Sequence, residues 1–148
     1  MEIHQSAVIL LLVLCVSFSA HAQPQPGYNN FLKQHVFGAM TVQKCDGEIH
    51  AREIVRPLTT NGCKEKNTFI LANKKDVKAV CDKAGTPQGD KRISNKPFPV
   101  VICKLQKKKK EDRPTHPHCE YRGTRSTRKI VVRCEDGWPV HYAEDVVV

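Results

Sequence analysis

The cysteines constrain this chain more than any other feature of its sequence. Six of them follow an apolar stretch at the start of the chain, at Cys45, Cys63, Cys81, Cys103, Cys119 and Cys134. An even number of cysteines in a short secreted chain predicts three disulfides, which stabilise a domain that has only a modest core. The spacing alone does not choose among the possible pairings. No CxxC pair occurs, so we expect no zinc site built from thiolates.

The start of the chain has the pattern of a secretory signal peptide. An apolar run over residues 7–16 includes the seventh cysteine, Cys15, and leads to the small-x-small sequence Ala20-His21-Ala22. The run is short for a membrane span, and no second one follows. The usual positive start is weak, because Glu2 precedes the run and no lysine or arginine does. We predict cleavage after Ala22, which leaves one domain over residues 23–148 and a secreted, extracellular protein.

The chain is also strongly basic. It has 24 Lys and Arg residues against 15 Asp and Glu residues, a formal net charge of +9. Cleavage after Ala22 would remove one acid and no base, leaving +10 over 126 residues. Such a charge favours polyanionic partners, namely nucleic acid, sulfated glycans or an anionic membrane. The alternative is that the charge serves solubility alone.

Local signals predict helices mainly in the first half of the chain. Asn29 or Asn30 is expected to cap the first helix, which ends near Gly38. Asn73 is expected to cap the third. The predicted helices cover residues 29–38, 45–56 and 74–83.

Strand signals dominate the second half. Residues 84–90 contain Gly, Pro and Asp and predict a loop. Asp136-Gly137 predicts a hairpin turn between the last two strands. The predicted strands cover residues 68–71, 98–105, 120–122, 127–135 and 140–148. Helices early and strands late predict an α+β domain.

Two histidines and a lysine form a candidate set for splitting an RNA phosphodiester. His35 shares a helix face with Phe31 and Gln34, Lys64 follows a cysteine, and His141 lies near the chain end. One imidazole can remove the 2′-OH proton, the other can protonate the leaving 5′-oxygen, and the ammonium can stabilise the added charge. This chemistry needs no metal or cofactor, because the substrate supplies its own nucleophile. Nothing local shows that the three residues meet, and a lone histidine on a helix face is more often packed than catalytic.

Three motifs, in this order along the chain, resemble the pancreatic ribonuclease superfamily. They are Phe31-x-x-Gln34-His35, Cys63-Lys64-x-x-Asn67-Thr68-Phe69 and Pro139-Val140-His141-Tyr142. With six cysteines in matching order, the resemblance covers nearly the whole chain after the leader. In outline it is most similar to angiogenin-like and fish secreted ribonucleases with three disulfides. It implies three short N-terminal helices packed on a bent antiparallel sheet, a V-shaped ribonuclease fold of the α+β class.

The resemblance also implies a role for each matched residue. His35 would be the general base, His141 the general acid, and Lys64 the residue that stabilises the transition state. The implied substrate contacts are Gln34 to a phosphate oxygen, Asn67 as a support of the cleft, Thr68 and Tyr142 to a pyrimidine base, and Glu135 to a purine on its 3′ side. The implied disulfides are Cys45–Cys103, Cys63–Cys119 and Cys81–Cys134.

The sequence departs from the family pattern in two places. The cysteines of a fourth disulfide are absent, and residues 84–90 replace the loop that it closes, which puts purine binding in question. The aspartate usually found two residues after the late histidine is replaced by Ala143. Either Glu144 or Asp145 takes over its task of orienting His141, or the imidazole is less well oriented and activity is lower.

The lysine run Lys107, Lys108, Lys109 and Lys110 has two interpretations. It is either a solvated loop or a contact for phosphate, heparin or the nuclear import machinery.

Two functions of different classes remain open at this point. The first is a monomeric, metal-free RNA endonuclease that cuts 3′ of pyrimidines to leave a 2′,3′-cyclic phosphate. The second is a cationic angiogenic or antibacterial protein that acts through its basic surface, with weak or dispensable ribonuclease activity. Its partners would be heparin-like glycans, an anionic bacterial membrane or a cell-surface receptor, with uptake into the nucleus of target cells as a further expectation.

Overall fold

The structure, a computed structural model, describes residues 25–56, 62–106 and 119–147. The predicted signal peptide and the Lys107–Lys110 run lie outside these residues. The helical elements are α2 (Pro26–His35), η1 (Val42–Lys44), α3 (Cys45–Ala51), α4 (Lys74–Lys78) and η2 (Ala79–Cys81). The strands are β1 (Lys66–Ile70), β2 (Gly85–Gln88), β3 (Lys91–Ser94), β4 (Phe98–Leu105), β5 (Tyr121–Glu135) and β6 (Trp138–Val147). Three α-helices on an antiparallel sheet confirm the predicted fold class.

The helix ends differ from the sequence prediction in ways that have local causes. Helix α2 begins at Pro26 rather than at Asn29 or Asn30, because a proline at the first helical position has a suitable φ and lacks an N–H that would go unpaired. It ends at His35, three residues before Gly38. The predicted cap of α4 is confirmed, since the Asn73 side chain accepts a hydrogen bond of 2.8 Å from the Asp76 amide.

The second predicted helix is too long at its C-terminal end. Helix α3 stops at Ala51, and Glu53 adopts a left-handed φ of 54° that a helix cannot continue. Val55 then pairs with Cys63 across a short bridge. The third helix is likewise shorter, because its last turn is the 3₁₀ element η2.

The strands form one antiparallel sheet in the order β1-β4-β5-β3-β2, with β6 also paired to β5. The predicted loop at 84–90 is wrong, because Gly89 (φ 63°) makes a turn and β2 pairs with β3 on the edge of the sheet. The two strands predicted at 120–122 and 127–135 are one continuous strand, β5. The predicted Asp136-Gly137 turn is confirmed, since both residues have positive φ, 51° and 83°, as a tight hairpin turn requires.

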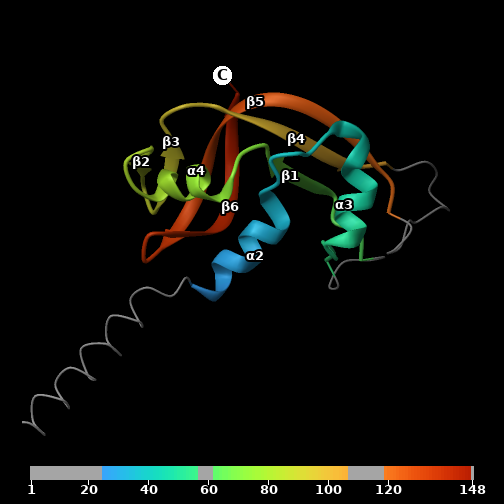
Figure 1. Ribbon diagram of the computed structural model, residues 1–148, viewed down its shortest axis with the longest axis horizontal. Helices are drawn as coiled ribbons and strands as arrows, with labels where there is room; N and C mark the ends of the chain where they lie inside the picture. The colour runs from blue at the N-terminus through green and yellow to red at the C-terminus, as the bar shows by residue number, and fades with distance from the viewer. Residues whose placement is uncertain (1–24, 57–61, 107–118, 148) are drawn as a thin grey trace, which may run out of the picture.

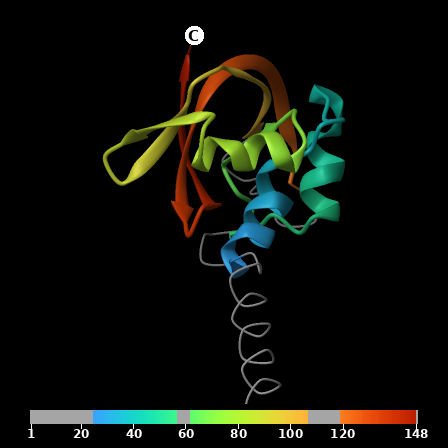
Figure 2. The same cartoon turned by 60° about the vertical axis from the view of Figure 1, so that its left-hand side comes forward.

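Two apolar cores hold the helices to the sheet, with α3 and α4 over different parts of it (Figures 1 and 2). One core packs α3 against β1, β4 and the start of β5, around Ile49, Phe69 and Tyr121. The other packs α2 and α4 against β1, β4 and β5, around Phe31 and Val77, and its residues of β1 and β4 alternate with those of the first core. Figure 2 shows the β2–β3 hairpin projecting beside α4, on the side away from α3. The end of α2 meets β1, where Val36 forms a bridge with Ile70.

Three disulfides connect these parts, with the pairing that the resemblance implied. Cys45–Cys103 joins α3 to β4, Cys63–Cys119 ties the approach to β1 to the approach to β5, and Cys81–Cys134 joins η2 to β5. Each bond closes a long loop of 53 to 58 residues. Cross-links over loops of this length restrict the unfolded chain strongly.

Candidate active site

His35 is the last residue of α2, and its imidazole is held in one orientation. Its Nδ1 lies 2.8 Å from the Thr68 carbonyl oxygen of β1. A carbonyl oxygen can only accept a hydrogen bond, so Nδ1 carries the proton and Nε2 keeps the lone pair. The Tyr142 ring stacks on the imidazole at 5.0 Å with an interplanar angle of 25°. The result is a neutral base with a fixed tautomer.

Burial sets the protonation of His35. The pKa of the imidazole is lowered from 6.5 to about 3. Desolvation by burial is the main cause, the bond to Thr68 opposes it, and the positive charges of Lys64 and His141 add to the lowering. The side chain is only 8% exposed. His35 is therefore neutral at physiological pH, as a proton acceptor must be. An anionic phosphate in the site would raise this pKa.

Lys64 presents its ammonium beside the same helix end. Its Nζ donates to Asn67 Oδ1 at 2.8 Å and to Gln34 Oε1 at 3.3 Å. The pKa of Lys64 is lowered from 10.5 to about 8, mainly by burial and in part by the positive charge of Arg56. The ammonium is half-buried and is fixed by neutral amide oxygens, so it keeps its positive charge for an anion.

Asn67 joins α2 to the lysine. Its Nδ2 donates to the Gln34 carbonyl oxygen at 2.8 Å, while its Oδ1 accepts from Lys64. The side chain is 2% exposed. The structure thus brings Gln34, His35 and Lys64 together through one buried amide.

Thr68 and Tyr142 form the next part of the site. Thr68 is 2% exposed and lies in β1, beside the His35 imidazole that its carbonyl binds. The pKa of Tyr142 is raised by burial and by the Asp145 carboxylate, while a hydrogen bond with the Thr68 side chain acts in the opposite direction. The phenol therefore stays protonated and donates to Asp145 Oδ2 at 2.9 Å.

His141 lies on β6 with an exposed side chain, near enough to His35 for its charge to lower the pKa of that residue. Asp145, one candidate for orienting His141, is bonded instead to Tyr142 and to Arg128 Nη1 at 2.6 Å. The side chain of the other candidate, Glu144, is outside the described residues. None of the described side chains hydrogen-bonds to the His141 imidazole.

The remaining predicted residue, Glu135, is less closely tied to this group. It is exposed at the end of β5, where it pairs with Trp138 across the β5–β6 turn. The sequence reasoning missed Arg128 as a partner of Asp145, because only the β5–β6 register places the two residues together. It also missed Arg52, although Glu48 four residues earlier is the spacing of a helical ion pair.

Over residues 25–56, 62–106 and 119–147, no group of three or more His, Cys, Asp and Glu residues is arranged to hold a metal ion. No helix in these ranges is long and apolar enough to cross a membrane.

Comparison with known proteins decides the family. The family model described as pancreatic ribonuclease matches residues 26–143. The chain belongs to the pancreatic ribonuclease family. Its relatives within this family include Ribonuclease-like 3 of Danio rerio, 46% identical over 154 residues and covering 100% of both chains. Angiogenin-4 of Mus musculus is 36% identical, over 81% of this chain and 79% of that protein.

Solved structures of pancreatic-type ribonucleases agree with the fold. The structure of RNase ZF-1A is 54% identical, covers 85% of this chain and 100% of its own, and superposes with a TM-score of 0.74. The structure of zebrafish RNase5 is 50% identical, covers 80% of this chain and 93% of its own, and has a TM-score of 0.73. The predicted membership among angiogenin-like and fish ribonucleases is confirmed. Membership of this family supports ribonuclease activity.

Proposed function

We propose that this protein is a secreted endoribonuclease that cleaves RNA on the 3′ side of pyrimidines and leaves a 2′,3′-cyclic phosphate. One observation carries the proposal. The imidazole of His35, which burial keeps neutral and the Thr68 carbonyl holds in one tautomer, lies in the same site as the Lys64 ammonium and near His141. These are the groups that an in-line attack by a 2′-hydroxyl requires.

The proposed reaction moves two protons and exchanges one bond. His35 Nε2 takes the proton of the 2′-hydroxyl while the 2′-oxygen forms a bond to phosphorus. The bond from phosphorus to the 5′-oxygen breaks, and the His141 imidazolium gives its proton to that oxygen. Lys64 stabilises the charge that develops on the non-bridging oxygens, and Gln34 donates to one of them. RNA itself supplies the nucleophile, so the scheme uses no cofactor.

Thr68 and Tyr142 are the proposed readers of the base. A hydroxyl both donates and accepts, so Thr68 can bond to the edge of either cytosine or uracil. The Tyr142 ring, fixed by its bond to Asp145 and by stacking on His35, offers a flat surface beside that edge. Asn67 supports the cleft, and Glu135 is the proposed contact for a base on the 3′ side.

Basic side chains next to the site suit a polyanionic substrate. Lys66, Lys104 and Arg122 face one another directly across β1, β4 and β5, and all three are exposed. Like charges placed opposite one another destabilise a sheet, which favours a role in binding an anion. We propose that a single RNA strand binds to a monomer across this row and the catalytic site.

The second candidate is a cationic signalling or host-defence role. It is favoured by the net charge of +9 and by relatives that are angiogenins. In this case heparin-like glycans, a bacterial membrane or a cell-surface receptor would be the partner, and nuclear uptake would follow receptor binding. The Lys107–Lys110 run would contribute to such contacts.

Product analysis of a defined oligonucleotide tests the proposal. A strand with a single cytidine among adenosines should be cut once, 3′ of the cytidine, to give a 2′,3′-cyclic phosphate and a 5′-hydroxyl that mass spectrometry identifies. EDTA should not change the rate. Uncut substrate, or products that carry a 5′-phosphate, would overturn the proposal. If a His141→Ala variant still kills bacteria as the wild type does, the basic surface rather than RNA cleavage explains the killing.

A further inference from the structure

Helix α2 ends at His35, the proposed general base, and the last carbonyl groups of this helix need hydrogen-bond donors. The final carbonyls of a helix have no N–H donor within the helix. Leu32 O is bonded by the Val36 amide, and Gln34 O by the Asn67 side chain. The Phe37 amide, which would reach Lys33 O if the helix continued, bonds to Ile70 O instead. Lys33 O and the following Val36 O therefore depend on another donor.

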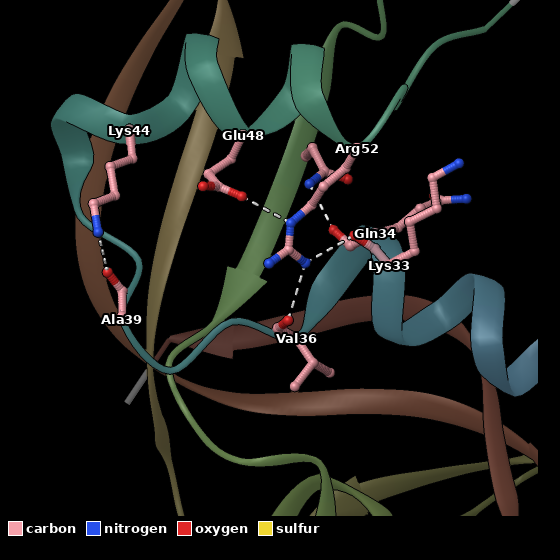
Figure 3. A network of polar contacts seen from close by, with 8 residues as sticks. Lys33, Gln34, Val36, Ala39, Lys44, Glu48 and Arg52 are labelled. Carbon is pink, nitrogen blue, oxygen red and sulfur yellow. Dashed lines mark hydrogen bonds and ion pairs between the residues drawn. The ribbon is translucent and has the colours of Figure 1, made fainter.

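Arg52 supplies both hydrogen bonds (Figure 3). Its Nη1 donates to Lys33 O at 3.1 Å and to Val36 O at 3.1 Å. The two carbonyls lie on either side of Gln34 and His35 in the chain. The guanidinium also places a positive charge at the C-terminal end of the helix, where the helix dipole favours it.

The guanidinium is itself held from three sides. Its Nε donates to Glu48 Oε2 at 2.9 Å, one helical turn earlier in the chain. Its central carbon lies 4.7 Å from the centre of the Phe37 ring and 5.6 Å from that of Phe69. Phe69 is fully buried and is the neighbour of Thr68, whose carbonyl holds the His35 imidazole. Arg52 thus joins α3, the end of α2 and β1 at one point.

We propose that Arg52 is a positioning residue for the reaction, which fixes the end of α2 so that His35 and Gln34 keep their place beside Lys64. This inference rests on the proposed function. Arg52 touches none of the reacting groups and acts only through the backbone of residues 33–36. A displacement of about 1 Å in a catalytic group can cost on the order of a hundredfold in rate.

Lysine cannot make all the contacts that arginine makes in this position. The planar guanidinium of Arg52 donates to two carbonyls through Nη1 and to a carboxylate through Nε. It also lies over aromatic rings. An ammonium has no plane and no fixed fork of donors. Lys44 offers a matched control. Its ammonium also lies over the Phe37 ring, 5.3 Å from the ring centre. It donates a hydrogen bond to Ala39 O, which lies outside α2 (Figure 3).

The test compares Arg52→Ala, Arg52→Lys and Lys44→Ala with the wild type in cleavage of a cytidine–adenosine dinucleotide, at a temperature where each is folded. Arg52→Ala should lower kcat about tenfold or more and change KM less than about threefold. Arg52→Lys keeps the charge and should recover less than half of the loss on a logarithmic scale. Lys44→Ala should stay within about twofold of the wild type. The nitrogen NMR signals of His35 should shift in both Arg52 variants and not in Lys44→Ala.

Three results would overturn the inference: a folded Arg52→Ala variant with wild-type kcat, full recovery by Arg52→Lys, or an equal loss in Lys44→Ala. If Arg52→Ala does not fold, the Arg52→Lys variant decides. A wild-type kcat together with unshifted His35 signals in that variant would overturn the inference. The NMR comparison needs no activity. If the wild type leaves RNA uncut, the proposed function fails, while unshifted His35 signals would still decide separately against the positioning role.

Discussion

At the scale of single residues, His35 links stability to pH. Its folded-state pKa is lowered, chiefly by burial and further by the charges of Lys64 and His141. Between about pH 3 and 6.5 the unfolded chain therefore binds more protons at this position than the folded chain does. The stability that the neutral imidazole contributes is complete above about pH 6.5 and is lost as the pH falls towards 3.

We expect acidification from about pH 7 to about pH 4.5 to destabilise the wild type by about 2 kcal/mol more than a His35→Asn variant, since each pKa unit corresponds to about 1.4 kcal/mol. Urea unfolding at the two pH values measures this difference. The asparagine amide can replace Nδ1 as donor to the Thr68 carbonyl, so it is a close control. Equal pH dependence in the two proteins would show that His35 is not buried as a neutral base.

The residues of the candidate site were predictable to different degrees. Gln34, His35, Lys64, Asn67 and Thr68 could be named because they lie in two short motifs with fixed spacing. The hydrogen bonds that join α2 to this second motif could not, since they connect residues 30 to 33 positions apart, as Asn67 joins Gln34. The contact of Asp145 with Arg128 depends on the register of β5 and β6, which the sequence does not reveal.

At the scale of elements, two glycines show that local preference determines some parts of the fold and tertiary contact determines others. Gly47 lies in α3, and no atom lies within 4 Å of the position that an added Cβ would take, so only helix propensity acts there. Gly85 opens β2, where an added Cβ would lie 1.9 Å from the Val80 carbonyl oxygen. Backbone packs against backbone at that point, because Arg92 draws together the carbonyls of residues 80, 82 and 85.

We therefore expect opposite effects from the same substitution. Gly47→Ala should stabilise the protein by about 0.5–1 kcal/mol, the usual gain in a helix. Gly85→Ala should destabilise it by about 3 kcal/mol or more, the range of severe overpacking. Thermal unfolding of both variants with disulfides intact measures the difference. A neutral Gly85→Ala would mean that the β2–β3 hairpin does not rest on η2.

The same contrast explains which elements could be predicted. The Asn73 cap and the Asp136-Gly137 turn depend on side chains or φ values within a few residues, and both predictions are correct. Strand β2 depends on contact with η2 and β3, so its Gly and Pro residues suggest a loop when only local signals are considered. The end of α3 could not be located from local signals, because Glu53 adopts a left-handed φ that its residue type does not favour.

At the scale of the whole molecule, charge is the property most relevant to function. The net charge is +9, and the row Lys66, Lys104 and Arg122 lies on three neighbouring strands. Neutralising phosphates releases bound counterions, so affinity for RNA depends on salt.

Affinity for a single-stranded RNA should fall about tenfold or more between about 50 mM and about 200 mM salt if about three phosphates are neutralised. Lys104→Ala should reduce the slope, whereas Lys75→Ala, an exposed lysine of α4, should leave it unchanged. Fluorescence anisotropy with His141→Ala protein avoids cleavage during the titration. Identical slopes for the two lysine variants would argue against the row as an RNA contact.

The central claim, that His35 and His141 transfer the protons of RNA cleavage, is tested most directly by the rate of the His141→Ala variant. His141 is exposed, so the fold and the other site residues should be preserved. Under single-turnover conditions with a cytidine-containing oligonucleotide, the variant should cleave about a hundredfold to ten-thousandfold more slowly than the wild type. A folded variant that cleaves at the wild-type rate would contradict the account.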